Sequence, residues 1–165
     1  MEDSAVRIAV CPGSFDPVTN GHLDIFARAS SIFDKIVVAV FHNPNKKPLF
    51  TMEERVEMLR VATAHIPNVQ VDCFSGLVYE YVRRQNSTII VRGLRALSDF
   101  EYEFQRALLI KKIDPQMETV FMMTTADYSF VSSTGVKELA RFGGDITGLV
   151  PAAVAAKIIE RLNQD

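Results

Sequence analysis

The sequence predicts a doubly wound α/β fold, in which helices cover both faces of a five-stranded parallel sheet. One observation is that apolar runs of strand length alternate with stretches of helical spacing along the chain. Another is that two of these runs, KIVVAVF and TIIV, are apolar almost without interruption. A strand with one wet face would alternate apolar and polar residues, so these runs indicate strands that are buried on both faces.

The expected strands are short, and several are rich in Val and Ile, which are typical of buried β-structure. They span residues 6–11, 35–41, 69–74, 88–91 and 118–124. A helical pattern follows each of them, which is the order of elements that a parallel sheet requires.

Two of the expected helices begin with a capping box, in which a hydroxyl and a carboxylate three residues later satisfy free backbone N–H groups. Thr51 with Glu54 starts the helix that Pro67 stops. Ser98 with Glu101 repeats the signal ahead of FEYEFQRALLIKK. We therefore expect Ser98 to be the N-cap residue of that long helix.

The last helix is expected at about 151–163. Pro151 suits the first turn of a helix, because its missing N–H would have had no partner there. Val154, Ile158 and Leu162 then form one apolar stripe, which predicts that the helix packs against the body of the protein.

Length and composition predict one domain spanning 1–165, because 48% of the residues are hydrophobic and no linker or repeat divides the chain. A net charge of −2 argues against general affinity for nucleic acid or membrane surfaces. The acidic start and the lack of a membrane-length apolar segment favour a cytoplasmic protein without nucleic-acid or membrane partners. Cys11 and Cys73 lie in strand-like runs without metal-ligand spacing, and we expect both to be buried free thiols.

Unusual residues collect where the expected strands end. In doubly wound sheets, ligands bind beyond the carboxyl ends of the strands, near the point where strand order reverses. The segments there are PGSFDPVTNGH, HNPNKKPLF, SGLV, RGLRALSDFEYE and TADYSFVSSTGVK. Any one of them alone fits an ordinary solvated loop, but the five together indicate a functional site at this edge.

The first of these segments contains two prolines and two glycines ahead of a single histidine. Gly21 opens the next helix and His22 lies in its first turn, where free N–H groups and the helix dipole favour an anion. A lone histidine is more often structural than catalytic, but this placement favours contact with a phosphate.

The next segment carries Lys46 and Lys47 between Pro44 and Pro48, which stiffen the loop. A solvated lysine pair is the commoner explanation of such a run. The alternative, which fits the neighbouring segments, is a second anion site.

Arg92 and Arg95 flank Gly93 directly after a buried strand, and each guanidinium can hold phosphate oxygens through two parallel hydrogen bonds. VSSTGVK places three hydroxyls, at 132–134, at another helix start. One hydroxyl is enough for capping, so three in a row favour a second phosphate-binding helix start.

Several other site types find no support in the sequence. There is no GxGxxG after the first strand and no GxxxxGK[ST], which argues against a dinucleotide redox site and a Walker ATPase. No Ser/His/Asp or Cys/His nucleophile set and no metal-ligand set is identified. Cations and hydrogen-bond donors remain, and these suit phosphate transfer by positioning and charge stabilisation.

These motifs carry a family resemblance. TNGH and VSSTGVK resemble the TxGH and ISSTxxR pair of the nucleotidyltransferase superfamily related to class I aminoacyl-tRNA synthetases. RGLRALSDFEYE, NPNKKPLF and FSGLV resemble the phosphopantetheine adenylyltransferase family, and the likeness runs from residue 6 to about 151. It implies a Rossmann-like nucleotidyltransferase fold, transfer of the adenylyl group of ATP with Mg²⁺ to phosphopantetheine, and a homohexamer built from two trimers.

The resemblance also implies roles for single residues. Those expected to carry catalysis are His22, Lys46 and Arg95. Those expected to bind ATP are Ser14, Phe15, His22, Gly93, Leu94, Arg95, Glu103, Tyr128, Ser129, Phe130, Val131, Ser132, Ser133 and Thr134. Those expected to hold phosphopantetheine are Ser14, Lys46, Val78 and Arg92.

Four positions depart from the commonest family pattern. Cys11 stands where Tyr is frequent, Tyr128 where Trp is frequent, and Lys137 where the superfamily often has Arg. Ile110 replaces an Asn that in many relatives helps to hold the pantetheine arm. The last departure bears on acceptor binding and leaves the reaction itself in place.

Two other functions are compatible with parts of the pattern. A sister transferase, such as a nicotinate-mononucleotide adenylyltransferase or a glycerol-phosphate cytidylyltransferase, shares TxGH but not the long middle motifs. A non-catalytic nucleotide sensor would keep the phosphate cradle and have no use for a second anion site. Lys46 and Arg92 therefore discriminate against the sensor.

Overall fold

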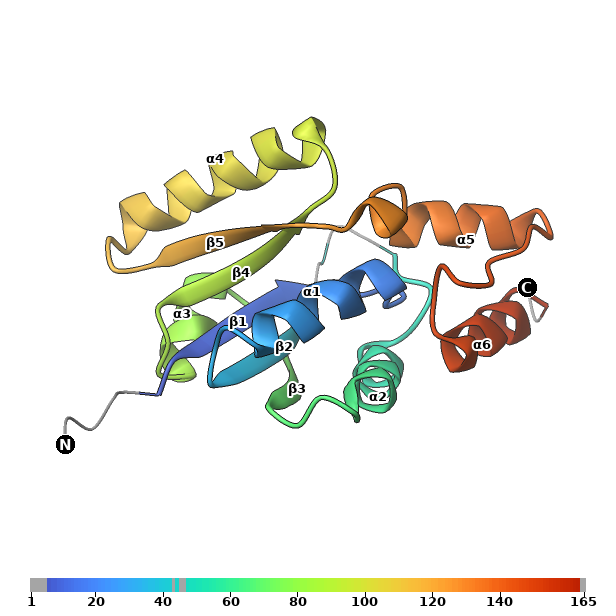
Figure 1. Cartoon of the computed structure of the whole chain (residues 1–165), viewed down its shortest axis with the longest axis horizontal. Helices are drawn as coiled ribbons and strands as arrows, with labels where there is room; N and C mark the ends of the chain where they lie inside the picture. Colours follow the sequence, from blue (N-terminus) through green and yellow to red (C-terminus); the bar gives the residue numbers. More distant parts are fainter. Residues whose placement is uncertain (1–5, 43, 45–46, 164–165) are drawn as a thin grey trace.

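In the computed structural model, which describes residues 6–42, 44 and 47–163, one parallel sheet of five strands has the order β3-β2-β1-β4-β5 (Figure 1). The strands are β1 (Ile8–Gly13), β2 (Lys35–Phe41), β3 (Val69–Phe74), β4 (Ile89–Leu94) and β5 (Glu118–Met123). The predicted fold class is confirmed.

Strands β1 and β4 run two and three residues further than expected. Pro12 and Gly13 pair with β2, and β4 pairs with β5 as far as Leu94. Proline and glycine here continue the strand before the chain turns. Gly13 and Gly93 therefore stand at the rim of the sheet and not in free loops.

The helices are α1 (Asn20–Ser30), α2 (Met52–Thr63), α3 (Val78–Arg84), α4 (Leu97–Ile113), α5 (Ser133–Arg141) and α6 (Ala152–Leu162), with a 3₁₀ turn η1 (Ala126–Tyr128). The capping box of Thr51 and Glu54 is confirmed. The expected cap at Ser98 is wrong, because α4 already begins at Leu97. Asp99 accounts for the earlier start. It lies in the first turn of α4, and its carboxylate accepts the backbone N–H of Arg95, just before the helix, at 3.1 Å.

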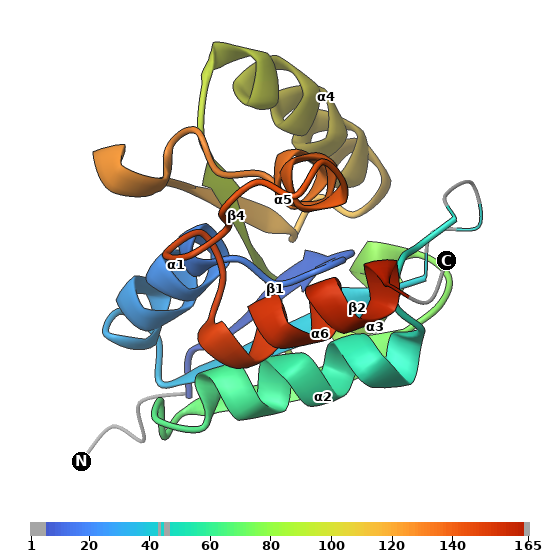
Figure 2. The same ribbon diagram turned by 90° about the vertical axis from the view of Figure 1, so that its right-hand side faces the viewer.

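Two cores lie on opposite faces of the sheet, because successive strand residues point to opposite sides. Ala9 and Cys11 of β1 face a core that α1, α2, α5 and α6 cover. Val10 faces the other core, which α3 and α4 cover. The apolar stripe of α6 is confirmed, with Val154 and Ile158 buried, and the helix lies beside α2 (Figure 2).

The order of the strands places the functional edge. From β1 the chain moves outward to β2 and β3, then returns to the other side of β1 to form β4 and β5. The carboxyl ends of β1 and β4 therefore flank the reversal point, where doubly wound sheets bind ligands.

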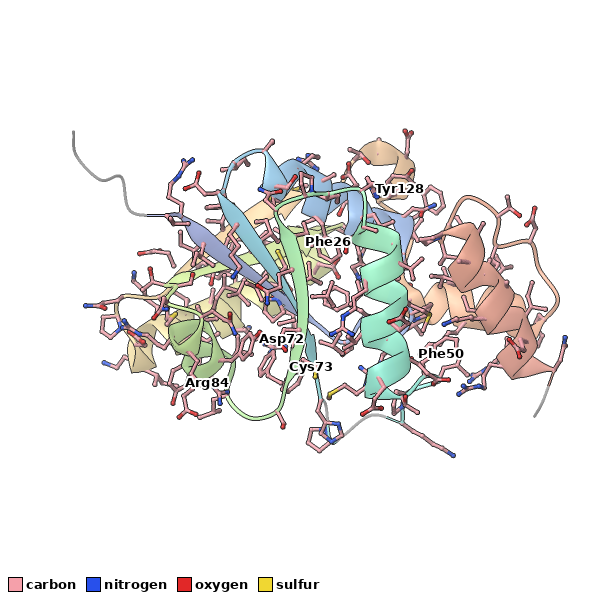
Figure 3. The ribbon with its side chains drawn as sticks, turned by 90° about the horizontal axis from the view of Figure 1, so that it is seen from below. Phe26, Phe50, Asp72, Cys73, Arg84 and Tyr128 are labelled. Atoms are coloured by element: carbon pink, nitrogen blue, oxygen red, sulfur yellow. The ribbon has the colours of Figure 1, made fainter. Side chains whose placement is uncertain are left out.

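The cysteines differ in exposure. Cys11 is buried, and burial raises the pKa of its thiol to about 12. Cys73 is exposed, so the expectation of two buried thiols is wrong for this residue (Figure 3). Its strand β3 is an edge strand in which Phe74 alone is buried, so this apolar run is not a covered one.

Among the described residues, none of the helices combines the length and the apolar character needed to span a membrane. The cytoplasmic location expected from the sequence stays a prediction.

Candidate active site

A cavity of about 520 Å³ opens beyond the carboxyl ends of β1 and β4. Its walls come from the turn after β1, the end of β4, η1 and the start of α5. The predicted residues that line it are Ser14, Phe15, His22, Arg92, Gly93, Arg95, Glu103, Tyr128, Val131, Ser132, Ser133 and Thr134. Segments more than 100 residues apart in the sequence thus meet in one site.

A second cavity of about 210 Å³ adjoins the first. The two share Pro12, Gly13, Ser14, Arg92 and Glu103 as lining residues. The other residues of the smaller cavity are Phe41, Val78, Ile90, Tyr102, Arg106, Ala107, Ile110 and Thr119. Apolar and polar side chains both line this branch, and it contains both Val78, which the resemblance assigns to the acceptor, and Ile110.

Four predicted contacts are not brought into either cavity by the described chain. Leu94 is buried and lines neither cavity. The Ser129 hydroxyl donates to the Ala126 carbonyl at 3.0 Å, and the Phe130 side chain is 74% exposed. Lys46 lies outside the described residues, although its neighbour Lys47 lines the larger cavity. Their proposed contacts stay predictions.

His22 is fixed by a second capping box, which the sequence did not reveal. Its Nδ1 accepts the backbone N–H of Thr19 at 3.0 Å, and the Thr19 hydroxyl accepts the backbone N–H of His22 at 3.3 Å. Burial, with the nearby guanidiniums of Arg95 and Arg92, lowers the pKa of His22 to about 4. The imidazole is therefore neutral at pH 7, and because Nδ1 is an acceptor, the proton is on Nε2.

The turn after β1 is tightly folded around Phe15. Phe15 has a left-handed backbone with φ 46°, and its ring packs edge-on against His22 at a centroid distance of 5.0 Å. A Cβ added to Gly13 would lie 2.7 Å from Cζ of this ring, so only glycine fits there. Phe15 is 7% exposed and belongs mainly to the core, although it borders the cavity.

Both predicted arginines are held by carboxylates of α4. Arg92 Nε donates to Glu103 Oε2 at 2.7 Å, and a further nitrogen donates to the carbonyl of Pro12. Arg95 Nε donates to Asp99 Oδ2 at 2.8 Å. These bidentate pairs fix the planes of the guanidiniums at the cavity wall.

The hydroxyls at the start of α5 have separate tasks. Ser132 caps the helix and accepts the backbone N–H of Gly135 at 2.9 Å. Ser133 donates to the carbonyl of Pro17 at 2.7 Å, which ties α5 to the first turn. The expectation that all three form a phosphate cradle is therefore incomplete, because two also have structural roles. The starts of α1 and α5 nevertheless border the same cavity.

Three charged cavity residues, two of them buried, were not predicted. The Asp16 carboxylate accepts Lys137 Nζ at 2.9 Å and the backbone N–H groups of Leu49 and Phe50 at 2.9 and 3.0 Å. Burial alone would raise the pKa of Asp16, but these hydrogen bonds bring it below its ordinary value. Arg55 donates to the carbonyl of Ser14 at 2.7 Å, and burial lowers its pKa.

Asp16 and Lys137 could have been identified from the sequence, because they lie inside the motifs PGSFDPVTNGH and VSSTGVK. Arg55 carried none, because one more arginine in a helix such as MEERVEMLRVAT is ordinary.

Comparisons with known proteins agree with this geometry. The model of the family described as Cytidylyltransferase-like matches residues 10–139. The phosphopantetheine adenylyltransferase of Heliobacterium modesticaldum is 58% identical over 156 residues, which are 94% of this chain and 93% of that protein. That of Carboxydothermus hydrogenoformans is 54% identical over 160 residues, 97% and 99% of the two chains.

A solved structure supports the fold alone. It is a putative nicotinate-nucleotide adenylyltransferase from Vibrio parahaemolyticus, 15% identical, which superposes with a TM-score of 0.71 over 97% of this chain and 96% of that one. Sequence identity above 50% over nearly whole chains is the more specific finding. The chain belongs to the phosphopantetheine adenylyltransferase family.

Proposed function

We propose that the protein transfers the adenylyl group of ATP to phosphopantetheine, giving dephospho-coenzyme A and pyrophosphate. The observation that carries the proposal is that two cavities meet at Ser14 and Arg92. The larger is lined by two helix starts and cations, as a triphosphate requires. The smaller has apolar side chains such as Val78 and Ile110 beside polar ones such as Arg106 and Thr119, which suits a pantetheine arm with its methyl groups and amides.

The reaction needs positioning more than a base. The acceptor phosphate has a second pKa near about 6, so it is largely dianionic at pH 7. One of its oxygens attacks the α-phosphorus of ATP, the bond from that phosphorus to the β-bridging oxygen breaks, and pyrophosphate leaves. Arg92, at the junction of the cavities, is placed to hold the acceptor phosphate in line with the α-phosphate.

Three residues are proposed to carry the charge that develops. His22 offers its Nε2 proton to the α-phosphate oxygens, and Arg95 neutralises charge on the triphosphate. Lys46 is assigned to catalysis and to the phosphopantetheine phosphate on the family resemblance alone, since it lies outside the described residues.

Nucleotidyltransferases generally use ATP with a divalent metal, and we propose Mg²⁺ bound to ATP as the substrate. The acidic residues among the described lining of the larger cavity are Asp16, Asp99 and Glu103. Each is paired with a lysine or an arginine. The metal is therefore expected to be held mainly by the triphosphate oxygens.

Pyrophosphate release tests the proposal. ATP with phosphopantetheine should give rapid release, while CTP or nicotinate mononucleotide in place of either substrate should not. Release with nicotinate mononucleotide would favour a sister transferase. Tight nucleotide binding without release for any acceptor would favour a sensor.

Arg92→Ala should weaken phosphopantetheine binding by about 10- to 100-fold and ATP binding by less than about threefold, because a charge-assisted phosphate contact is lost on one substrate only. Calorimetric titration with each ligand measures both effects. Arg95→Ala is the matched control and should weaken ATP binding instead. Equal losses of affinity for both ligands in Arg92→Ala would mean that the assignment of Arg92 to phosphopantetheine is wrong.

We also propose a homohexamer arranged as a dimer of trimers, and α4 supports self-association. This helix lies on the outside of the sheet (Figure 1) and exposes large apolar side chains, among them Tyr102, Leu109 and Ile113 at 60%, 62% and 55%. Light scattering should give about six times the chain mass of 18.4 kDa. Leu109→Glu should lower that mass, and a monomer mass for the unaltered protein would refute the assembly.

A further inference from the structure

Arg55, near the start of α2, lines the larger cavity although it is only 4% exposed. Its Nε donates to the carbonyl of Thr51 at 3.2 Å, and its Nη1 donates to the carbonyl of Ser14 at 2.7 Å. The guanidinium is thus anchored both to its own helix and to the turn after β1. Because Ser14 lines both cavities, the second anchor places Arg55 next to their junction.

The third nitrogen of this guanidinium, Nη2, has no hydrogen-bond partner among the described residues. In the part of the chain that the structure describes, no side-chain nitrogen or oxygen is both buried and unpaired. Nη2 is therefore open to the cavity that Arg55 lines. Since the two anchored nitrogens fix the plane of the group, Nη2 is a donor of fixed direction for an acceptor in the cavity.

The charge of Arg55 is not balanced by a carboxylate. The acidic residues among the described lining of the larger cavity, Asp16, Asp99 and Glu103, are each paired with another cation. None of the ion pairs between described residues includes Arg55. Burial lowers the pKa of Arg55, and Asp16 and Glu53 act on it only at longer range, but a guanidinium stays protonated at pH 7.

A buried cation without a counter-ion is costly, because the charge loses its hydration and gains no ion pair in return. Lys47, in the same cavity, is exposed and keeps its contact with water. Arg55 is not exposed in this way, so its charge is stabilised when an anion enters the cavity. The burial of Arg55 without a carboxylate therefore indicates an anionic ligand.

We propose that Arg55 is a further ATP-binding residue, whose Nη2 donates to an oxygen of the triphosphate in the larger cavity. The inference rests on the proposed function, in which ATP occupies this cavity. Phosphate oxygens accept charge-assisted hydrogen bonds from a guanidinium, whereas the adenosine part of ATP carries no charge that would balance Arg55. The family resemblance assigns no role to this residue.

Calorimetric titration of the full-length protein with ATP and with adenosine tests the contact. Arg55→Met removes the charge but keeps a long side chain, and it should weaken ATP binding by about 10- to 100-fold while adenosine binding changes less than about twofold. Arg55→Lys keeps a charge but has one nitrogen in place of three, so a smaller loss of ATP affinity, about 3- to 10-fold, is expected. Arg60→Met is the matched control, because Arg60 is an exposed cation of the same helix that lines neither cavity, and it should leave both affinities unchanged.

The outcomes separate the inference from the function. If unaltered protein binds ATP and Arg55→Met binds it equally well, the contact is wrong. Equal losses for ATP and adenosine would make Arg55 merely structural and would overturn it as well. Arg55→Lys gives the same decision if Arg55→Met does not fold, since its loss should also be confined to ATP. Failure of unaltered protein to bind ATP would refute both proposals, whereas ATP binding that depends on Arg55 without AMP transfer to phosphopantetheine would refute the proposed function alone.

Discussion

His22→Ala should lower kcat by about 10² to 10³, roughly 3 to 4 kcal/mol, while ATP affinity changes less than about fivefold. Negative charge on the α-phosphate oxygens changes most during displacement, so a donor aimed there acts mainly in the transition state. Arg95 and the starts of α1 and α5 remain to bind ATP in the ground state.

The geometry around His22 supports the proposed role as a hydrogen-bond donor. Thr19 holds Nδ1, which leaves Nε2–H free to face the cavity that His22 lines. With a pKa of about 4, the imidazole contributes a neutral hydrogen bond and no full charge, which sets the expected effect at that of one preorganised donor.

Single-turnover AMP transfer, measured beside equilibrium ATP binding, checks this role. His65→Ala is a suitable control, because His65 is exposed and lines neither cavity. A large loss of ATP binding with an unchanged chemical step would make His22 a ground-state anchor.

The protonation of His22 should also make the stability of the protein depend on pH. The folded-state pKa of about 4 lies below the unfolded value of 6.5, so the unfolded chain takes up the proton first as pH falls. The resulting stability is complete above pH 6.5 and is lost between pH 6.5 and 4, by at most about 3 kcal/mol. The free energy of unfolding measured with urea should therefore fall more steeply over this pH range for the unaltered protein than for His22→Ala. If both proteins lose stability equally with falling pH, the imidazole is not held neutral in the folded protein.

Local sequence patterns predicted the sheet and the location of the site. Continuous apolar runs indicate covered strands, and glycine, proline and cations after each strand indicate the functional edge. The placement of His22, Arg92 and Arg95 at the cavity was predicted this way, because position at a helix start or strand end depends on a few neighbouring residues.

The ion pairs of the site could not be predicted in the same way. Asp16 and Lys137 are separated by 121 residues, and Asp16 and Phe50 by 34. Which carboxylate meets which cation depends on the register of strands and the direction of helices, and neither is encoded in a short segment. Glu103 illustrates the point, since its carboxylate accepts from Arg92, a contact that the resemblance did not indicate.

Asp16→Ala should destabilise the protein by about 3 to 5 kcal/mol, because it leaves the ammonium of Lys137 without its partner in a largely buried site. The backbone N–H groups of Leu49 and Phe50 lose their acceptor as well. The matched control is Asp34→Ala, whose ion pair with Arg7 is exposed and should contribute far less to stability. Urea denaturation at pH 7 gives both values.

A double-mutant cycle with Lys137→Met separates the pair from the rest of the network. Removing both charges should cost less than the sum of the single changes, since no ion is then left unpaired. The lowered pKa of Asp16 gives a further sign: its stabilisation is present above the ordinary carboxyl pKa of about 3.9 and disappears as pH falls through the folded value. Additive single changes, or an Asp16→Ala cost no larger than that of Asp34→Ala, would mean that Asp16 does not tie α5 to the turn that leads to His22.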